Sequence, residues 1–183
     1  TASVATPLLI YQKLIKQPDC SALDHCNAAI NLLDDMLDSA LPGGLAGPLR
    51  FENFLARRFS MGLYQVGEDG VMFYFSAETD EGVMPAELHR ALANALETVA
   101  QNGMPDETFQ KVKDRRLSDF DANNDQPQTM RDVLITSASI REEPRDLAFG
   151  RKAVDATTPR MTQILLDALV GEGRTVVRYI LPE

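Results

Sequence analysis

Two histidines are the only imidazoles that this sequence offers for metal binding or proton transfer. His25 lies in the segment Asp-His-Cys-Asn and His89 in Leu-His-Arg-Ala, and neither has a second histidine within one helical turn. A catalytic zinc ion normally takes three protein ligands, and the helical zinc motifs HxxEH and HExxH place two histidines on one helix face. We therefore expect no metal ligand and no catalytic residue in this segment. Both histidines are interpreted as ordinary, partly exposed helix residues.

The remaining charged and glycine-rich stretches do not form a catalytic pattern. The sequence has no GxSxG elbow, no GxxxxGK[ST] phosphate loop and no GxGxxG after a strand. Segment 42–48 is glycine-rich, but it follows a helix between prolines, which favours a flexible turn over a ligand cradle. Asp34, Asp35 and Asp38 could together bind a hard cation. A solvated acidic face is the preferred interpretation, and we interpret the basic run 113–116 as a solvated face in the same way.

Composition and charge restrict the class of protein. Hydrophobic residues make up 44% and charged residues 25% of the 183 residues, which is typical of one globular domain spanning 1–183. Eighteen Lys and Arg against 27 Asp and Glu give a net charge of −9, which disfavours nucleic acid as a partner. No apolar run approaches the roughly 20 residues that a membrane span requires.

The two cysteines, Cys20 and Cys26, leave the redox state open. Cys26 falls on the apolar stripe of an expected helix, which favours a buried free thiol. A disulfide with Cys20 is the alternative in an oxidising compartment, but two cysteines do not make a disulfide framework. The cysteines therefore leave the redox compartment unsettled.

A hairpin over residues 60–79 is the clearest structural element. Val71, Phe73, Phe75 and Ala77 alternate with more polar residues, as in a strand with one buried face. Glycines between the two runs suit a tight turn. We expect the apolar face of this hairpin to form the floor on which the helices pack.

The other segments show mostly helical periodicity. The segregation of strands and helices predicts an α+β fold, with a largely antiparallel sheet packed against a layer of helices. The expected elements are a strand over 8–16, a helix with the stripe Leu23, Cys26, Ile30, Leu33 and Leu37, a short helical stretch over 48–59, helices over 86–101 and from 105 to about 120, a break near 123–127, helices near 130–140, 146–154 and 158–170, and a strand over 175–181.

Three features, taken in order along the chain, resemble a known family. The first is a helix, a glycine turn and a short helix over 30–59. The second is the helix start 102–113, Asn-Gly-Met-Pro-Asp-Glu-Thr-Phe-Gln-Lys-Val-Lys, and the third is the ending built from 156–161 and 174–182. This order and spacing resembles a half-domain of the zinc metallopeptidase family that includes pitrilysin, insulin-degrading enzyme and mitochondrial processing peptidase.

The resemblance implies a role for the chain. Family members have two similar halves, and only the first carries the inverted motif HxxEH with a more distant Glu. This chain therefore looks like the C-terminal, non-catalytic half of a longer protein, inactive alone. Such a half helps to bind peptide substrate and close a chamber. Its expected partner is the N-terminal catalytic half or a partner subunit, in a homodimer or heterodimer, which would hold the zinc.

The resemblance also suggests two substrate-binding residues. In many second halves an Arg and a Tyr about seven residues apart polarise the scissile carbonyl, a task that suits a cation and a phenol donor. Arg57 and Tyr64 have that spacing. Placing Pro48 on the family's Ser-Arg-Leu segment would instead put Phe54 at the Arg position. Two other functions stay open, namely an inactive scaffold of the same fold and an unrelated domain that binds a small molecule over the hairpin.

Overall fold

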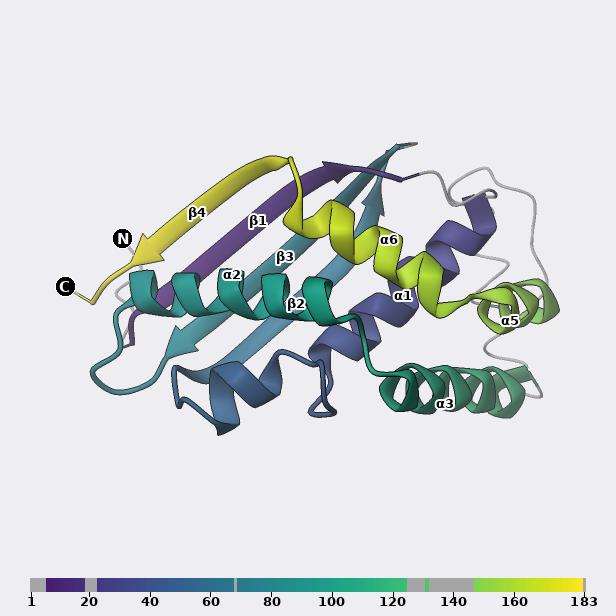
Figure 1. The fold of residues 1–183 in the computed structure, drawn as a ribbon, viewed down its shortest axis with the longest axis horizontal. Coiled ribbons are helices and arrows are strands. Elements are labelled where there is room, and N and C mark those ends of the chain that lie inside the picture. Colours follow the sequence, from purple (N-terminus) through teal and green to yellow (C-terminus); the bar gives the residue numbers. More distant parts are fainter. Residues whose placement is uncertain (1–5, 19–22, 68, 125–130, 132–146, 183) are drawn as a thin grey trace.

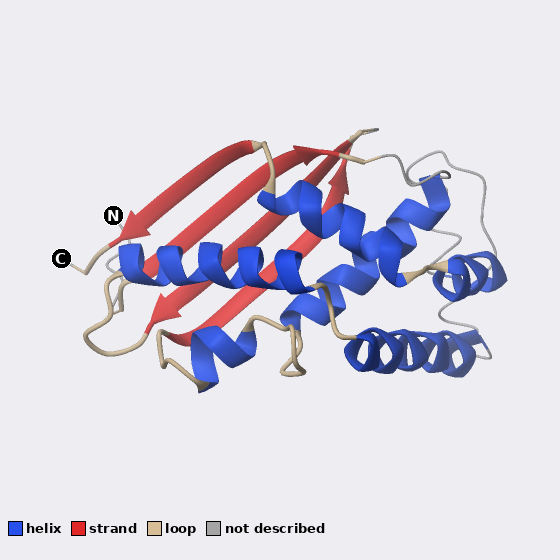
Figure 2. Ribbon diagram, in the orientation of Figure 1, coloured by secondary structure: helices blue, strands red, loops and turns tan. Residues whose placement is uncertain are grey.

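An antiparallel sheet carries the helices on one of its faces (Figures 1 and 2). The structure is a computed structural model that describes residues 6–18, 23–67, 69–124, 131 and 147–182. Within these residues the sheet has four strands in the order β2-β3-β1-β4, and every neighbouring pair is antiparallel. The predicted α+β class and antiparallel sheet are therefore confirmed. The strands are β1 (Leu8–Lys16), β2 (Ala56–Val66), β3 (Gly70–Thr79) and β4 (Arg174–Ile180).

The predicted hairpin is the pair β2 and β3. Gly67 lies in the turn with φ of 66°, a conformation that costs glycine little. Val71, Phe73, Phe75 and Ala77 are all buried and face the helices, as the alternation predicted.

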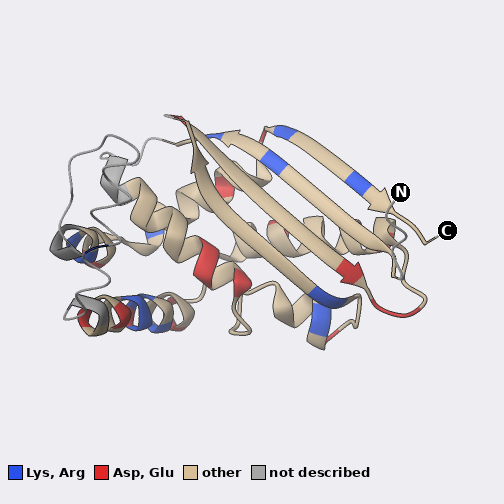
Figure 3. Cartoon of the chain, turned by 180° about the vertical axis from the view of Figure 1, so that it is seen from behind, with Lys and Arg blue, Asp and Glu red and all other residues tan. Residues whose placement is uncertain are grey.

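One layer of helices covers this face. α1, α2 and α6 contact the strands, and α3 and α5 pack against α1 to the side of the sheet, next to its β2 edge (Figures 1 and 3). α1 is therefore covered from two sides, which explains why it buries more than one apolar stripe. The helices are α1 (Leu23–Asp38), the single π-turn η1 (Gly47–Phe51), α2 (Pro85–Asn102), α3 (Asp106–Asn124), α5 (Leu147–Ala156) and α6 (Pro159–Val170).

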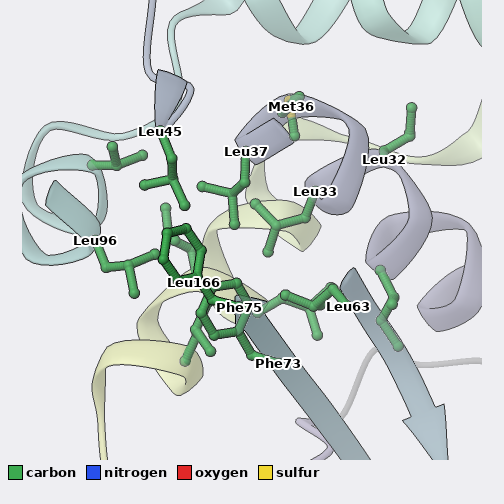
Figure 4. Packing of buried hydrophobic residues seen from close by; sticks show 14 of the residues in the cluster. Leu32, Leu33, Met36, Leu37, Leu45, Leu63, Phe73, Phe75, Leu96 and Leu166 are labelled. Carbon is green, nitrogen blue, oxygen red and sulfur yellow. The ribbon is translucent and has the colours of Figure 1, made fainter. Parts of the chain in front are cut away.

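The core lies between the sheet and α1 (Figure 4). Leu33 and Leu37 come from the predicted stripe of α1, and Leu32 and Met36 belong to a second row that the periodicity did not single out. All four are fully buried. On α2 the predicted stripe is confirmed in full, because Leu88, Leu92, Ala95, Leu96 and Val99 are buried.

The expected short helix over 48–59 is wrong in most of its length. Helical structure ends at Phe51, and β2 already begins at Ala56, which pairs with Thr79. The apolar residues Phe51 and Phe54 suggested a buried helical stripe, but both are exposed. Pairing with β3 determines the structure from Ala56 onwards, since strand formation depends on cross-strand neighbours more than on local preference.

Three other expectations concern regions at or beyond the limits of the described residues. Cys26 is buried and disulfide-bonded, so the free-thiol interpretation is wrong, and Cys20 lies outside the described residues. The expected helix over 130–140 and most of the break at 123–127 also lie outside them. In the described part of the chain, no helix is long and apolar enough to span a bilayer.

Candidate functional site

The candidate site is the face of the sheet opposite the helices, which no helix of the described residues covers (Figures 1 and 3). We call it the open face. The strand register places on it every second residue of each strand, and Lys16, Arg58, Glu78, Arg174 and Arg178 are its charged members. We treat this face as the candidate site because exposed apolar surface is typical of binding sites. Its apolar members are Leu8, Ile10, Leu14, Tyr64, Val66, Met72, Tyr74, Val176 and Ile180.

Tyr64 lies on the open face near the end of β2, across from Met72. Its side chain is 47% exposed. A methyl group added at Gly62 would lie 3.4 Å from Cε1 of Tyr64, so the phenol ring folds back over this glycine. Because Gly62 has no side chain, the ring of Tyr64 can lie against the strand at this point. The outer surface of the ring stays accessible to a ligand.

Arg57 lies at the opposite end of β2 and does not meet Tyr64. Seven residues of extended strand span about 23 Å. Arg57 falls in a register irregularity between Ala56 and Arg58 and is exposed. It lines a hollow of about 560 Å³ with the turn that leads from Asp80 to Met84. The two candidate residues could therefore contact separate points of an extended chain, but not one carbonyl group.

Arg58 is the arginine that shares the open face with Tyr64, and sequence reasoning missed it. Strand parity could have found it, because residues six apart share a face and residues seven apart do not. Arg58 forms an ion pair and hydrogen bond with Glu78 across the strands. This hydrogen bond, and then the charges of Arg58 and Arg57, hold the pKa of Glu78 below its usual value. This end of the sheet thus carries two arginines and one ionised carboxylate.

The acidic and basic runs expected to be solvated faces instead contact other parts of the protein. Asp35 of α1 accepts a hydrogen bond at 2.7 Å from Nε of Arg116 on α3. Lys113 donates to the carbonyl oxygens of Asp155 and Thr157 at 2.5 and 3.0 Å, and so holds the end of α5. These contacts join helices that are distant in sequence, so helical periodicity alone did not predict them.

Asp34 ties α1 to the outer edge of the sheet. Its Oδ1 accepts the backbone N–H of Leu63 at 2.8 Å. Because β2 is an edge strand, this carboxyl group satisfies an N–H that has no partner strand. Burial raises the pKa of Asp34 to about 6, with a further contribution from the charges of Asp35 and Asp38. The folded protein therefore binds a proton at Asp34 more readily than the unfolded chain does.

The sign of this pKa shift predicts the effect of a substitution. Stabilisation from protonated Asp34 is fully present below about pH 4 and is lost as the pH rises through about 6. Asp34→Asn keeps an acceptor for the Leu63 N–H and removes the buried charge. We expect it to raise the free energy of unfolding by about 1 kcal/mol near pH 8. Urea unfolding near pH 5 and pH 8 measures this.

Asp119→Asn on the exposed side of α3 is the control for the loss of one negative charge. We expect it to change the free energy of unfolding by less than about 0.5 kcal/mol at either pH. A destabilised Asp34→Asn variant near pH 8 would show that the ionised carboxylate contributes more through its hydrogen bond than it costs by burial.

His89 takes part in contacts between a helix and the sheet. Nδ1 of His89 lies 2.8 Å from the Tyr179 hydroxyl, and its ring packs against Tyr11 with centroids 5.4 Å apart. Burial lowers the pKa of His89. His89 thus links α2 to β4, while His25 lies on α1. In the described part of the chain, no three His, Cys, Asp or Glu side chains gather to hold a metal ion. These residues do not fit a zinc centre.

Comparison with known proteins identifies the fold. No protein-family model and no curated protein matches the sequence. Among solved structures, a protease from Helicobacter pylori is similar with a TM-score of 0.79 and 13% identity, over 100% of this chain and 42% of that one. A candidate M16-like peptidase from Alicyclobacillus acidocaldarius gives a TM-score of 0.76 and 18% identity, over 99% of this chain and 42% of that one.

A third structure matches from end to end. It is the inactive peptidase domain of a candidate zinc protease from Bordetella parapertussis, with a TM-score of 0.75 and 15% identity over 100% of this chain and 97% of that one. The chain thus spans less than half of the two longer peptidases and nearly all of this inactive domain. It has the fold of an M16-type peptidase half-domain, and the resemblance noted in the sequence is confirmed at the level of fold.

Proposed function

We propose, from this shared fold, that the chain is the non-catalytic, C-terminal half of a zinc metallopeptidase. The observation that carries the proposal is the end-to-end likeness to an inactive peptidase domain, in a chain whose sequence lacks HxxEH. The zinc ion and the catalytic Glu then lie on another segment or on a partner subunit. No catalytic step runs through this chain's own histidines.

In this proposal the open face helps to enclose and bind peptide substrate. Its apolar residues and the two tyrosines Tyr64 and Tyr74 suit contact with an unfolded chain, since aromatic side chains offer large contact areas at low entropic cost. The Arg58–Glu78 pair provides charged groups at one end of this face, and Arg57 lies beside it at the same end of the sheet. Arg57 and Tyr64 contact the substrate at two separated points.

Reconstitution of the peptidase from its parts tests the proposal. We expect the chain alone to bind no zinc stoichiometrically and to cleave no quenched fluorescent peptide. The zinc-carrying half alone should cleave slowly, and adding this chain should raise kcat/KM at least about tenfold through substrate positioning. Zinc content is measured by atomic absorption on each preparation.

Two results would contradict the proposal. One is full cleavage by the zinc-carrying half without this chain. The other is zinc bound by the chain alone and lost in a His25→Ala/His89→Ala variant. If the complete protein and its partner subunits all lack HxxEH and cleave nothing, the chain is instead a scaffold of the same fold.

A further inference from the structure

A groove of about 470 Å³ runs along α2. α2 and η1, which contribute residues to its lining, lie on the helix-covered side of the sheet, away from the open face (Figure 1). Ala91, Ala95 and Val99 recur every fourth residue and therefore share one face of the helix. Ala95 and Val99 are buried beneath the groove, so this apolar row is its floor. The opposite wall is formed by the turn at Gly43 and the start of η1 at Pro48. The glycine-rich segment 42–48 therefore borders a groove that is large enough for a ligand.

A row of uncharged polar side chains forms the rim of the groove on α2. Asn94, Thr98 and Asn102 line it, recur every fourth residue and are exposed. Each asparagine offers both an amide donor and a carbonyl acceptor, and the threonine offers a hydroxyl group. Their side chains make no hydrogen bond to any other described residue, so they are available to a ligand. Alternating donors and acceptors match the N–H and C=O groups of a peptide backbone.

Glu52 is the only ionisable side chain among the residues that line the groove. It lies on the wall opposite the polar rim and is exposed. With no cationic residue in the lining, a phosphate or carboxylate ligand would meet only repulsion from this carboxylate. A ligand with one positive charge is therefore the electrostatic complement of the groove, and the net charge of −9 acts in the same direction.

Two exposed phenylalanines lie close to Glu52 in the sequence but outside the lining of the groove, and the guanidinium of Arg50 lies 5.5 Å from the ring centroid of Phe51. Phe51 and Phe54 are 53% and 65% exposed. Phe54 has φ of 52°, the left-handed region that an aromatic residue rarely adopts. The side chain of Asn53 donates to the Pro48 carbonyl at 2.8 Å and holds this loop in place. Such a conformation persists only where the surroundings impose it, and it presents both rings to solvent.

We propose that this groove binds an extended peptide segment of three or four residues that carries one lysine or arginine. From Ala91 to Val99 the helix rises about 12 Å, and each extended residue spans about 3.3 Å, which gives this length. The backbone pairs with the polar rim, the basic side chain pairs with Glu52, and a neighbouring apolar side chain contacts the floor at Ala91 and Ala95. The site does not depend on the proposed peptidase role, because it lies on the other side of the sheet.

Three blocked tetrapeptides test the proposal by NMR titration of the ¹⁵N-labelled full chain. They are acetyl-Ala-Leu-Lys-Ala-amide and its analogues with norleucine or glutamate in place of lysine. We expect the lysine peptide to shift the amide signals of Ala95, Thr98 and Gly44 saturably. The norleucine peptide should bind about two- to fivefold more weakly, which is the range of one exposed ion pair. The glutamate peptide should bind more weakly still.

Matched variants separate groove binding from general effects. Ala91→Leu fills the floor and should weaken binding of the lysine peptide at least about tenfold, whereas Ala93→Leu on the exposed side of the same helix should not. Glu52→Gln should make the lysine and norleucine peptides bind equally, and Glu97→Gln should leave their difference unchanged. If Ala91→Leu does not fold, Thr98→Lys on the exposed rim replaces it, and should favour the glutamate peptide.

Several outcomes would overturn the proposal. The first is the absence of saturable shifts with the lysine peptide, and the second is equal binding of all three peptides to the unmodified chain. A third is equal binding of lysine amide alone, which would assign the groove to small amines. Shifts of the same signals that depend on protein concentration without peptide would assign it to a second copy of the chain.

Discussion

Replacing both Arg57 and Tyr64 by alanine in the complete peptidase is expected to lower kcat/KM for peptide cleavage about a hundredfold. Each residue is exposed and positioned to contact substrate in the proposed function, and truncating such a contact typically costs a factor of about ten. Stability should change little, because neither side chain belongs to the hydrophobic core. Steady-state kinetics and urea unfolding of the same preparations measure the two effects.

The single variants make this prediction sharper. Because about 23 Å of strand separates the residues, they cannot act on one substrate atom, and their effects on the activation free energy should add. Tyr64→Phe separates the contribution of the hydroxyl group to activity from that of the ring. Arg115→Ala on α3 is the control for loss of an exposed arginine. A double variant no worse than one single variant would indicate a shared contact. Equal losses of activity and stability would leave β2 with a structural role alone.

Phe75→Ala is expected to have the largest effect on stability. Phe75 is fully buried on β3 and stacks on Phe59 with ring centroids 5.3 Å apart. Truncating a buried phenylalanine costs about 3–5 kcal/mol, since contacts are lost and a cavity remains. For a chain of this size the melting temperature should fall by about 10 °C. Thermal and urea unfolding measure both quantities.

Tyr74 provides a matched control, because it is the next residue on the same strand and faces the opposite side of the sheet. It is half-buried on the open face. Tyr74→Ala should cost about 1 kcal/mol, since the ring contacts strand neighbours but no helix. Equal costs for the two substitutions would mean that the open face is packed as tightly as the core.

The parts of the fold that the sequence predicted well have strong local signals. β1 has the predicted bounds Leu8 to Lys16 because an apolar-rich run lies between two prolines. α2 shows one apolar stripe because only one of its faces meets the sheet and α6. In both elements a single periodicity coincides with a single buried face, so the local pattern determines the structure.

The errors arose where distant contacts determine the structure. The start of β2 at Ala56 depends on pairing with Thr79, and nothing within the segment itself indicates a strand there. Arg116 and Asp35 appeared as members of solvated charge runs because their partners lie far apart in the sequence. The groove beside α2 could not be predicted either, because its two walls meet only in the folded chain. For the candidate site, the sequence suggested Arg57 and Tyr64 as binding residues. It did not predict how far apart they lie in the sheet.

The position of β1 affects how the protein folds during its synthesis. β1 comes before the other described strands in the sequence, yet it lies between β3 and β4, so that Leu8 pairs with Glu78 on one side and with Ile180 on the other. One edge of this leucine- and isoleucine-rich strand therefore stays unpaired until β4 has been synthesised. Contacts of such long sequence separation slow folding and prolong exposure of an aggregation-prone edge. Any truncation that removes β4 would leave that edge open permanently.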